Sequence, residues 1–234
     1  MSVALVTGAS RGFGFALSQE LARGGWHVIV DSRDAEALRA AAIGLSAAGR
    51  ITALPGDVSN PGHRAELVAA ASEQGRLDLL VNNASTIGAT PLPRLSEYPT
   101  EELERVLQVN TIAPLALIQA AFPLLMTSRG TIVNVTSDAA AEAYEGWGGY
   151  GSSKAALDQL SAVMAVEQPD LRIYSFDPGD MRTQMHQEAF PGEDISDRPL
   201  PEAVVPSLLR LIHERPPSGR YRASDLPAVA ESTP

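Results

Sequence analysis

Tyr150 and Lys154 lie four residues apart, and every other one of the 18 Lys and Arg residues in the chain is arginine. On a helix, side chains at this spacing share a face, with Cβ atoms roughly 5–6 Å apart. A nearby ammonium favours a phenolate, so we expect Lys154 to lower the pKa of Tyr150 from its ordinary value of about 10. The tyrosine could then exchange a proton with a substrate alcohol or carbonyl.

Two further observations bear on this pair. Arginine stays charged in proteins and cannot pass a proton on, which would explain a lysine at this one position. Ser137 ends a predicted strand, where its hydroxyl could stabilise charge on a substrate oxygen. Simpler interpretations stay open, because the pair could be an ordinary helix-surface contact and the serine could bond only to backbone.

The composition limits the classes of partner and site. The chain has 234 residues, 44% hydrophobic content, a net charge of -10 and no cysteine. Without a basic stretch, we expect no nucleic acid and no membrane as a partner. No His/Asp/Glu cluster surrounds His186, and Cys ligands are absent, so we expect no metal. The start MSVALVTGAS lacks a signal peptide and no apolar run approaches about 18 residues, which predicts a soluble, cytoplasmic protein.

Short apolar segments alternate with longer amphipathic ones and must position these residues. Strands are predicted at 3–7, 27–31, 51–55, 77–83, 131–137, 171–176 and 219–223. Helices are predicted at 12–24, 34–48, 61–74, 100–126, 151–167 and 201–214. The strands are continuous apolar runs, as expected for burial on both faces. The alternation indicates an α/β chain, a Rossmann-type doubly wound parallel sheet with helices on both faces, in a single domain 1–234.

The segment TGASRGFG at 7–14 connects the first predicted strand to the first helix. Its glycines, Gly8, Gly12 and Gly14, permit a tight turn and leave the helix N-terminus facing a ligand. That end of a helix favours phosphate groups. The spacing differs from G-x-G-x-x-G, and a plain strand-to-helix turn is the simpler alternative. Its place after the first strand favours a dinucleotide site.

The glycine loop resembles that of the short-chain dehydrogenase/reductase family, in its shorter single-domain subtype. Further motifs follow in the family's order over nearly the whole chain: DV at 57–58, NNAS at 82–85, VN at 109–110, NVTS at 134–137, YGSSK at 150–154 and PGDMRT at 178–183. Ser85 stands where the family has glycine. The resemblance implies a catalytic set of Asn110, Ser137, Tyr150 and Lys154, with Asn110 holding a water and Lys154 also binding the nicotinamide ribose.

The resemblance also implies the residues that bind a nicotinamide cofactor. They are Gly8, Ser10, Arg11, Gly12, Phe13, Gly14, Ser32, Arg33, Asp57, Val58, Asn83, Ala84, Ser85, Tyr150, Lys154, Pro178, Gly179, Met181 and Thr183. The helices at 100–126 and 151–167 resemble the family's interfaces and imply a homodimer or homotetramer. The segment of about 184–200 falls where the family has its substrate lid. Pocket candidates are Met181, Met185, His186 and Phe190, faced by Tyr144 and Trp147.

The second strand ends in DSRD, 31–34, which should select the cofactor. Arg33, with Arg11, could pair with the 2′-phosphate of NADP, whereas Asp31 could accept from the free 2′-hydroxyl of NAD. In the family's register the discriminating acid falls at Ser32, so we expect NADP, with NAD as the alternative.

We therefore expect an NADP-dependent oxidoreductase that interconverts a small-molecule carbonyl and an alcohol, with Tyr150 as the acid/base. A catalytically silent nucleotide-binding sensor or scaffold of the same fold is the alternative. A sugar-nucleotide epimerase or dehydratase of the family's longer subtype fits less well, because it has other glycine spacing and a larger C-terminal region.

Overall fold

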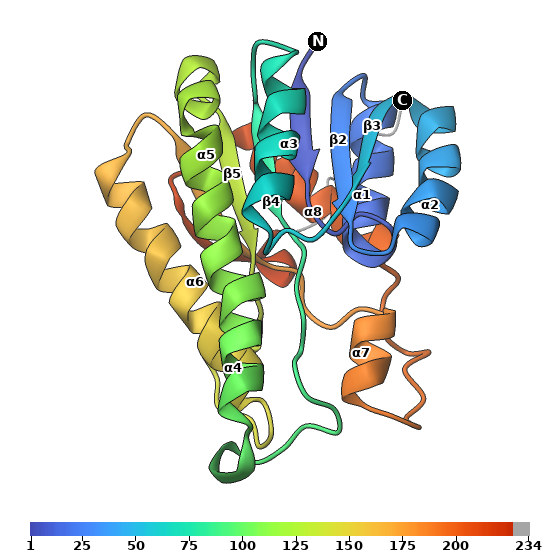
Figure 1. Cartoon of the computed structure of the whole chain (residues 1–234), viewed down its shortest axis with the longest axis vertical. Helices are drawn as coiled ribbons and strands as arrows, with labels where there is room; N and C mark the ends of the chain where they lie inside the picture. The colour runs from blue at the N-terminus through green and yellow to red at the C-terminus, as the bar shows by residue number, and fades with distance from the viewer. Residues whose placement is uncertain (227–234) are drawn as a thin grey trace.

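The computed structural model describes residues 1–226, which form one parallel sheet flanked by helices (Figure 1). The strands run in the spatial order β3-β2-β1-β4-β5-β6-β7, and every neighbouring pair is parallel. Their bounds are β1 Val3–Val6, β2 His27–Ser32, β3 Arg50–Pro55, β4 Leu79–Asn82, β5 Thr131–Val135, β6 Arg172–Asp177 and β7 Gly219–Arg222. The predicted parallel, doubly wound architecture is confirmed.

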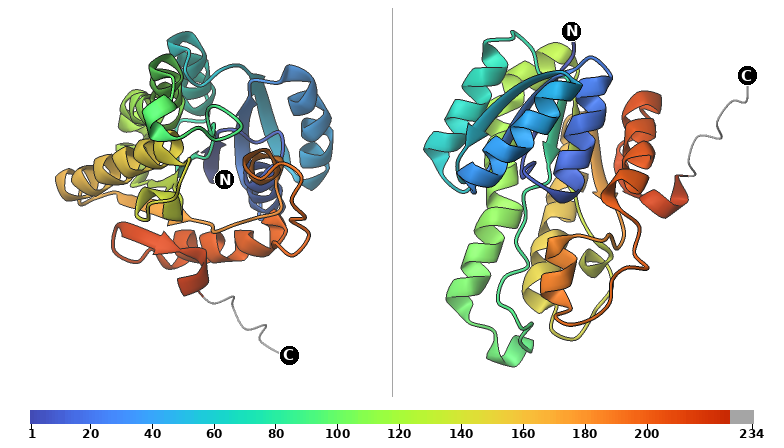
Figure 2. Two further views of the ribbon diagram at one scale, coloured as in Figure 1. Left: turned by 90° about the horizontal axis from the view of Figure 1, so that it is seen from below. Right: turned by 90° about the vertical axis from the view of Figure 1, so that its right-hand side faces the viewer.

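Helices cover both faces of the sheet (Figure 2). One apolar core joins the sheet to α1 Gly12–Arg23, α2 Ala35–Ala48 and α8 Pro201–Glu214. The other face packs against α3 Pro61–Ser72, α5 Ala113–Ser128 and α6 Gly148–Glu167. All residues of β1, β4 and β5 are buried, which explains why these strands read as continuous apolar runs instead of alternating ones.

The strand order reverses beside β1, and this places the ligand crevice. The chain proceeds from β1 outward to β2 and β3, then returns to β4 on the other side of β1. At such a switch point the loops that leave the carboxyl ends of the two central strands diverge and open a crevice. The glycine loop follows β1 and the segment NNAS spans the end of β4, so both lie at this crevice.

The predicted helix at 100–126 is interrupted. It consists of α4 Thr100–Leu107, a π-helical turn at Gln108–Ile112 and α5. Pro114 has no N–H to donate to the Asn110 carbonyl four residues earlier, so the regular α-helical bond cannot form there. Asn110 therefore lies inside the π turn. The helix predicted from 151 begins earlier, at Gly148, and the predicted lid segment contains the short helix α7 Gln184–Ala189.

The expectation that no apolar run approaches the length of a membrane span is wrong for one helix. Thr100–Ser128 is long and apolar enough to cross a bilayer by composition, with a mean hydropathy of 1.6 over its most apolar window. Half of that window is buried inside the fold, because α5 packs against the sheet and α3. The segment is a core helix, and core packing accounts for its apolar character.

Candidate active site

Two positions in the loop between β1 and α1 require glycine because neighbouring backbone packs closely against them, more than because a ligand must approach. Gly8 has φ +68°, and a Cβ there would lie 2.8 Å from the Cα of Ala84. At Gly14 a Cβ would lie 2.5 Å from the amide nitrogen of Asn83 and 2.7 Å from the Gly8 carbonyl oxygen. Any side chain would therefore force the glycine loop away from the end of β4.

Hydrogen bonds join the same two segments. The Thr7 hydroxyl accepts from the backbone N–H groups of Asn83 and Ala84, both at 3.0 Å, and the Asn83 amide donates to the Thr7 carbonyl at 2.8 Å. Within residues 1–226 no side chain caps the N-terminus of α1, and its first turn has no acidic residue. The loop thus turns an uncapped helix N-terminus toward the cleft, and this arrangement fits the diphosphate of a dinucleotide.

Asp31 is unavailable to a ribose, which weighs against the NAD alternative. Its side chain is fully buried, with one oxygen accepting from the Gly8 N–H at 2.7 Å and the other 3.1 Å from Nε2 of His63. Ser32 is half-buried and donates to the Ser10 hydroxyl at 2.9 Å, while Arg33 is exposed and lines the cleft. The strand end therefore presents a hydroxyl and a guanidinium, and its carboxylate faces inward.

A cleft of about 780 Å³ connects the glycine loop to Tyr150. It is lined by all the predicted cofactor residues except Gly14 and by all the predicted catalytic residues except Asn110. Asp57 accepts from the Ser59 N–H at 2.8 Å, and Val58 is buried with its carbonyl bound by Arg64. The size suits a dinucleotide with a small substrate, since ligand pockets measure roughly 300–1,000 Å³. Arg11 also reaches across the cleft and donates to Gln184 of α7 at 2.6 Å.

Tyr150 and Lys154 share the first turns of α6, as the spacing predicted. Both side chains are buried, and the Lys154 amino nitrogen lies 5.6 Å from the centre of the Tyr150 ring. That nitrogen donates to the Val135 carbonyl at 2.8 Å. Burial lowers the pKa of Lys154 to about 8, although the negative charge of Asp158 acts to raise it. A lysine with this pKa can lose its proton near neutrality.

The expected depression of the Tyr150 pKa is wrong for the protein alone. Burial raises the pKa of Tyr150, and the charges of Asp177 and Asp138 add to that effect. Hydrogen bonds with Ser137 and Ser85 act in the opposite direction but are weaker. Lys154 does not compensate, because its amino group is directed to the Val135 carbonyl and burial favours its neutral form. Tyr150 is therefore a neutral phenol.

Ser137 lies beside Tyr150, whereas Asn110 is more remote. The Ser137 hydroxyl donates to Asp138 at 2.8 Å and accepts from the Ala139 N–H at 3.2 Å. The Asn110 amide donates to the Thr86 carbonyl and the Ser153 hydroxyl, and its oxygen accepts from Ser85 and the Thr86 N–H. Asn110 thus fixes the segment after β4 to α6, and its water-holding role stays a prediction.

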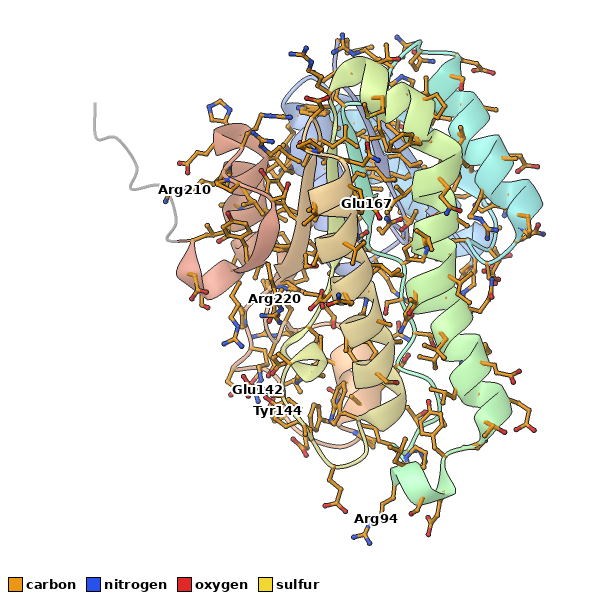
Figure 3. The ribbon with its side chains drawn as sticks, turned by 90° about the vertical axis from the view of Figure 1, so that its left-hand side faces the viewer. Arg94, Glu142, Tyr144, Glu167, Arg210 and Arg220 are labelled. Carbon is orange, nitrogen blue, oxygen red and sulfur yellow. The ribbon has the colours of Figure 1, made fainter. Side chains whose placement is uncertain are left out.

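Aromatic residues surround the substrate end of the cleft. Trp147 contacts Tyr150 and Phe190, with ring centres 5.6 and 5.9 Å apart, and His186 packs against Phe190 at a tilt, with ring centres 4.9 Å apart. Met185 and Phe190 pack with this group. Tyr144 was predicted to face them, but it is exposed and donates to Asp138 and Glu142 on the outer surface (Figure 3). The described residues contain no cluster of His, Asp and Glu that could hold a metal.

The sequence reasoning missed three polar residues at this site, which are His63, Asp177 and Arg220. His63 partners Asp31, and Arg220 of β7 donates to the buried Asp177 at 3.0 Å. Each of these pairs joins residues far apart in the chain, so spacing gave no signal. Asp177, a carboxylate directly after the predicted strand at 171–176, was the one signal in the sequence.

The family comparison agrees with this geometry. The short chain dehydrogenase family matches residues 2–194. This chain belongs to the short-chain dehydrogenases. Mouse sepiapterin reductase is a relative with 33% identity over 202 residues, which cover 80% of this chain and 77% of that protein.

Two further relatives extend the comparison. A 3-oxoacyl-[acyl-carrier-protein] reductase of rhamnolipid biosynthesis from Pseudomonas aeruginosa is 40% identical over 172 residues. That match covers 70% of this chain and 66% of the relative, just under two thirds of its length. A protein from Shigella flexneri, assigned to the short-chain dehydrogenases and crystallised with NADP, superimposes with a TM-score of 0.87. It is 30% identical, and the match covers 95% of this chain and 97% of that one.

Proposed function

We propose that this short-chain dehydrogenase is an NADPH-dependent carbonyl reductase in which Tyr150 protonates the substrate oxygen. The supporting observation is the group formed by Tyr150, Ser137 and Lys154 at one end of the cleft that begins at the glycine loop. Reduction adds a hydride to the carbonyl carbon and a proton to its oxygen. NADPH, when bound, supplies the hydride. Because its pKa is raised, Tyr150 keeps a proton to donate, and Lys154 can replace it.

NADP is the preferred cofactor because of the residues that end β2. Both oxygens of Asp31 already contact other groups, the Gly8 N–H and the His63 ring. Arg33 is exposed and lines the cleft, where its guanidinium could pair with a 2′-phosphate. The Shigella relative crystallised with NADP supports the assignment. The diphosphate would lie at the N-terminus of α1, and Lys154 would hold the nicotinamide ribose.

The substrate is proposed to be a neutral carbonyl compound with an apolar substituent. The cleft around Tyr150 is lined by Ile87, Trp147 and Met185, and a charged substituent would lose its hydration there. The reductase names of the mouse and Pseudomonas relatives support this reaction class. We propose that the lid, residues 184–200, closes this end, with Arg11 and Gln184 connecting it to the glycine loop.

We propose that the chain forms a single catalytic domain and that two or four copies assemble into a homodimer or homotetramer. The proposed location is the cytoplasm. Ile112, at the end of the π-helical turn before α5, is 49% exposed, and Val163 and Val166 of α6 are 44% and 83% exposed. A second copy that covers these helices would remove their apolar side chains from water. Light scattering after size-exclusion chromatography measures the mass, and a monomer would contradict the proposal.

A panel of aldehydes, ketones and diketones with NADPH, followed by cofactor absorbance, tests the reaction. Tyr150→Phe should lower kcat by about a hundredfold or more while it retains cofactor binding, because only the proton donor is removed. Tyr144→Phe is the matched control and should keep nearly parental turnover, since that hydroxyl lies outside the cleft. Turnover of Tyr150→Phe within about tenfold of the parent would exclude Tyr150 as the donor. Tight NADPH binding with no turnover of any compound would favour the silent sensor.

Titration of both cofactors tests the preference for NADP. Arg33→Ala should weaken NADPH binding by about tenfold or more, the equivalent of one charge-assisted hydrogen bond, and leave NADH binding nearly unchanged. Arg39→Ala removes an exposed arginine of α2 as a control. Tighter binding of NADH to the parent would reject the assignment of NADP.

A further inference from the structure

Arg220, in the last strand β7, reaches three acceptors around the active site. Its guanidinium donates to the Ser137 carbonyl at 2.9 Å, to Asp177 at 3.0 Å and to Asp158 at 3.2 Å. The Asp177 side chain is 5% exposed and the Arg220 side chain 27%. Figure 3 shows Arg220 beside α6, above Glu142 and Tyr144. A planar guanidinium presents five N–H donors in a fixed fork and can bridge several acceptors in this way, whereas an ammonium is a compact point charge with three donors.

We propose that Arg220 is a positioning residue of the active site. It fixes the backbone of Ser137 and pairs with Asp158 and Asp177, two carboxylates whose charges act on Lys154 and Tyr150, so that their effect is weakened. This inference rests on the proposed roles of Tyr150 and Lys154 in proton transfer.

The contact with Asp158 determines the state of Lys154. Asp158 follows Lys154 by one helical turn, a spacing at which opposite charges commonly pair. In the described residues no carboxylate oxygen lies within ion-pair distance of the Lys154 nitrogen, which binds the Val135 carbonyl instead. Asp158 binds Arg220 through one oxygen, and within residues 1–226 its other buried oxygen has no hydrogen-bond partner. Arg220 thus holds Asp158 out of direct contact with Lys154 and weakens the charge that Lys154 feels from it, so that Lys154 remains able to release a proton.

The contact with Asp177 acts on Tyr150 and on the loop that follows β6. Asp177 also accepts from the Gly179 N–H at 3.0 Å, so the pair with Arg220 holds the start of the segment PGDMRT. The negative charge of Asp177 raises the pKa of Tyr150, as does that of Asp138. Arg220 places a permanent positive charge against Asp177 and limits this effect.

Other charged groups face the same region and define a control. Asp138 binds the hydroxyls of Ser137 and Tyr144. Arg222, two residues along β7, lies 3.9 Å from Asp177 but donates to Glu142 at 3.2 Å. Arg222→Gln therefore removes an equal charge from the same strand and leaves the contacts to Ser137 and Asp158 intact.

The lysine pKa gives a test that needs no turnover. Because Lys154 is the only lysine, protein labelled with ¹³C at lysine Cε gives a single lysine signal, which can be titrated by NMR. Arg220→Gln should raise the pKa of Lys154 by about half a unit or more, because a nearby cation is lost and Asp158 becomes unpaired. Arg222→Gln should shift it by less than half as much. Asp158→Asn should lower it, since a carboxylate is removed and Arg220 remains.

Kinetics give the second measurement. Arg220→Gln should lower kcat by about tenfold or more with little change in NADPH affinity, because the reacting groups lose their alignment. The pH at half-maximal alcohol oxidation should rise, and Arg220→Lys should restore part of kcat. A parent without turnover would reject the proposed reaction but leave the NMR result to decide on Arg220.

Two NMR outcomes would overturn the inference. One is an unchanged Lys154 pKa in folded Arg220→Gln, and the other is an equal shift in Arg222→Gln. If Arg220→Gln does not fold by circular dichroism, Arg220→Met, which is also uncharged, and Asp158→Asn decide. A Lys154 pKa that is the same as the parent's in both variants would also overturn it.

Discussion

Asp31 and Asp177 are buried carboxylates at the ends of strands on opposite sides of the cleft, and each holds a glycine N–H. Asp31 accepts from Gly8 and Asp177 from Gly179, at 2.7 and 3.0 Å. The remaining oxygen of Asp31 meets His63, whereas that of Asp177 meets Arg220. Histidine titrates near neutral pH and arginine does not. The glycine loop is therefore held by a pair that depends on pH, and the catalytic end by a permanent charge.

The largest effect is expected at the more deeply buried pair. Asp31→Ala should lower the free energy of unfolding by about 3–5 kcal/mol, because it leaves His63 and the Gly8 N–H without their partner. Denaturant unfolding without cofactor measures it. Asp170→Ala, at an exposed aspartate, should change it by less than about 0.5 kcal/mol. A loss below about 1 kcal/mol for Asp31→Ala would show that the two pairs do not differ as proposed.

The pair at the catalytic end should matter less for stability. Asp177→Ala should lower the free energy of unfolding by about 1.5–3 kcal/mol, the range for hydrogen bonds to charged groups. Arg220 is partly exposed and keeps Ser137 and Asp158 as acceptors, so its charge does not become isolated. The same unfolding experiment compares the two alanine variants. A loss at Asp177 equal to or larger than that at Asp31 would reverse the ranking.

The smallest effect is a pH dependence that only the His63 pair should show. The hydrogen bond to Asp31 raises the pKa of His63, against burial. Its stabilisation is complete below the unfolded pKa of about 6.5 and is lost as pH rises through the higher folded value. The free energy of unfolding should fall over that range by at most about 1.4 kcal/mol per pH unit, the limit for one proton.

Urea midpoints for the parent and His63→Gln, measured from about pH 6 to pH 9, isolate this dependence as a difference. Between about pH 6 and pH 7, below the range in which Lys154 titrates, Arg220→Gln should retain the parental slope, since arginine does not titrate there. A parental slope in His63→Gln would assign the dependence to another group.

Sequence periodicity was sufficient to predict the layers, and the resemblance to the family supplied the order of the catalytic motifs. Buried parallel strands need apolar residues on both faces, so the segments VALV and TIVNV could be recognised as strands from the sequence. The relation of Tyr150 to Lys154 follows from helix geometry alone. The π turn was missed, although the sequence contains a local signal for it. Pro114 has no N–H, so the carbonyl four residues earlier loses its α-helical hydrogen-bond partner.

The electrostatics of the site could not be predicted in this way. The Tyr150 pKa depends on how much water the folded chain excludes, and spacing does not report that quantity. The partner of Asp31 is 32 residues away and that of Asp177 is 43 residues away. Three other histidines and 16 other arginines could have satisfied those carboxylates, and only the packing of α3 and β7 selects among them.

The bonds of Thr7 have a consequence for the order in which the protein is made. The Thr7 hydroxyl and carbonyl receive N–H groups from Asn83, 76 residues later in the chain. Until the ribosome has released β4, the glycine loop lacks the backbone that holds it. Such distant pairing carries a loop-closure cost that local helices do not have. The first third of the nascent chain should therefore form helices early, and its nucleotide loop should become ordered only when β4 pairs with β1.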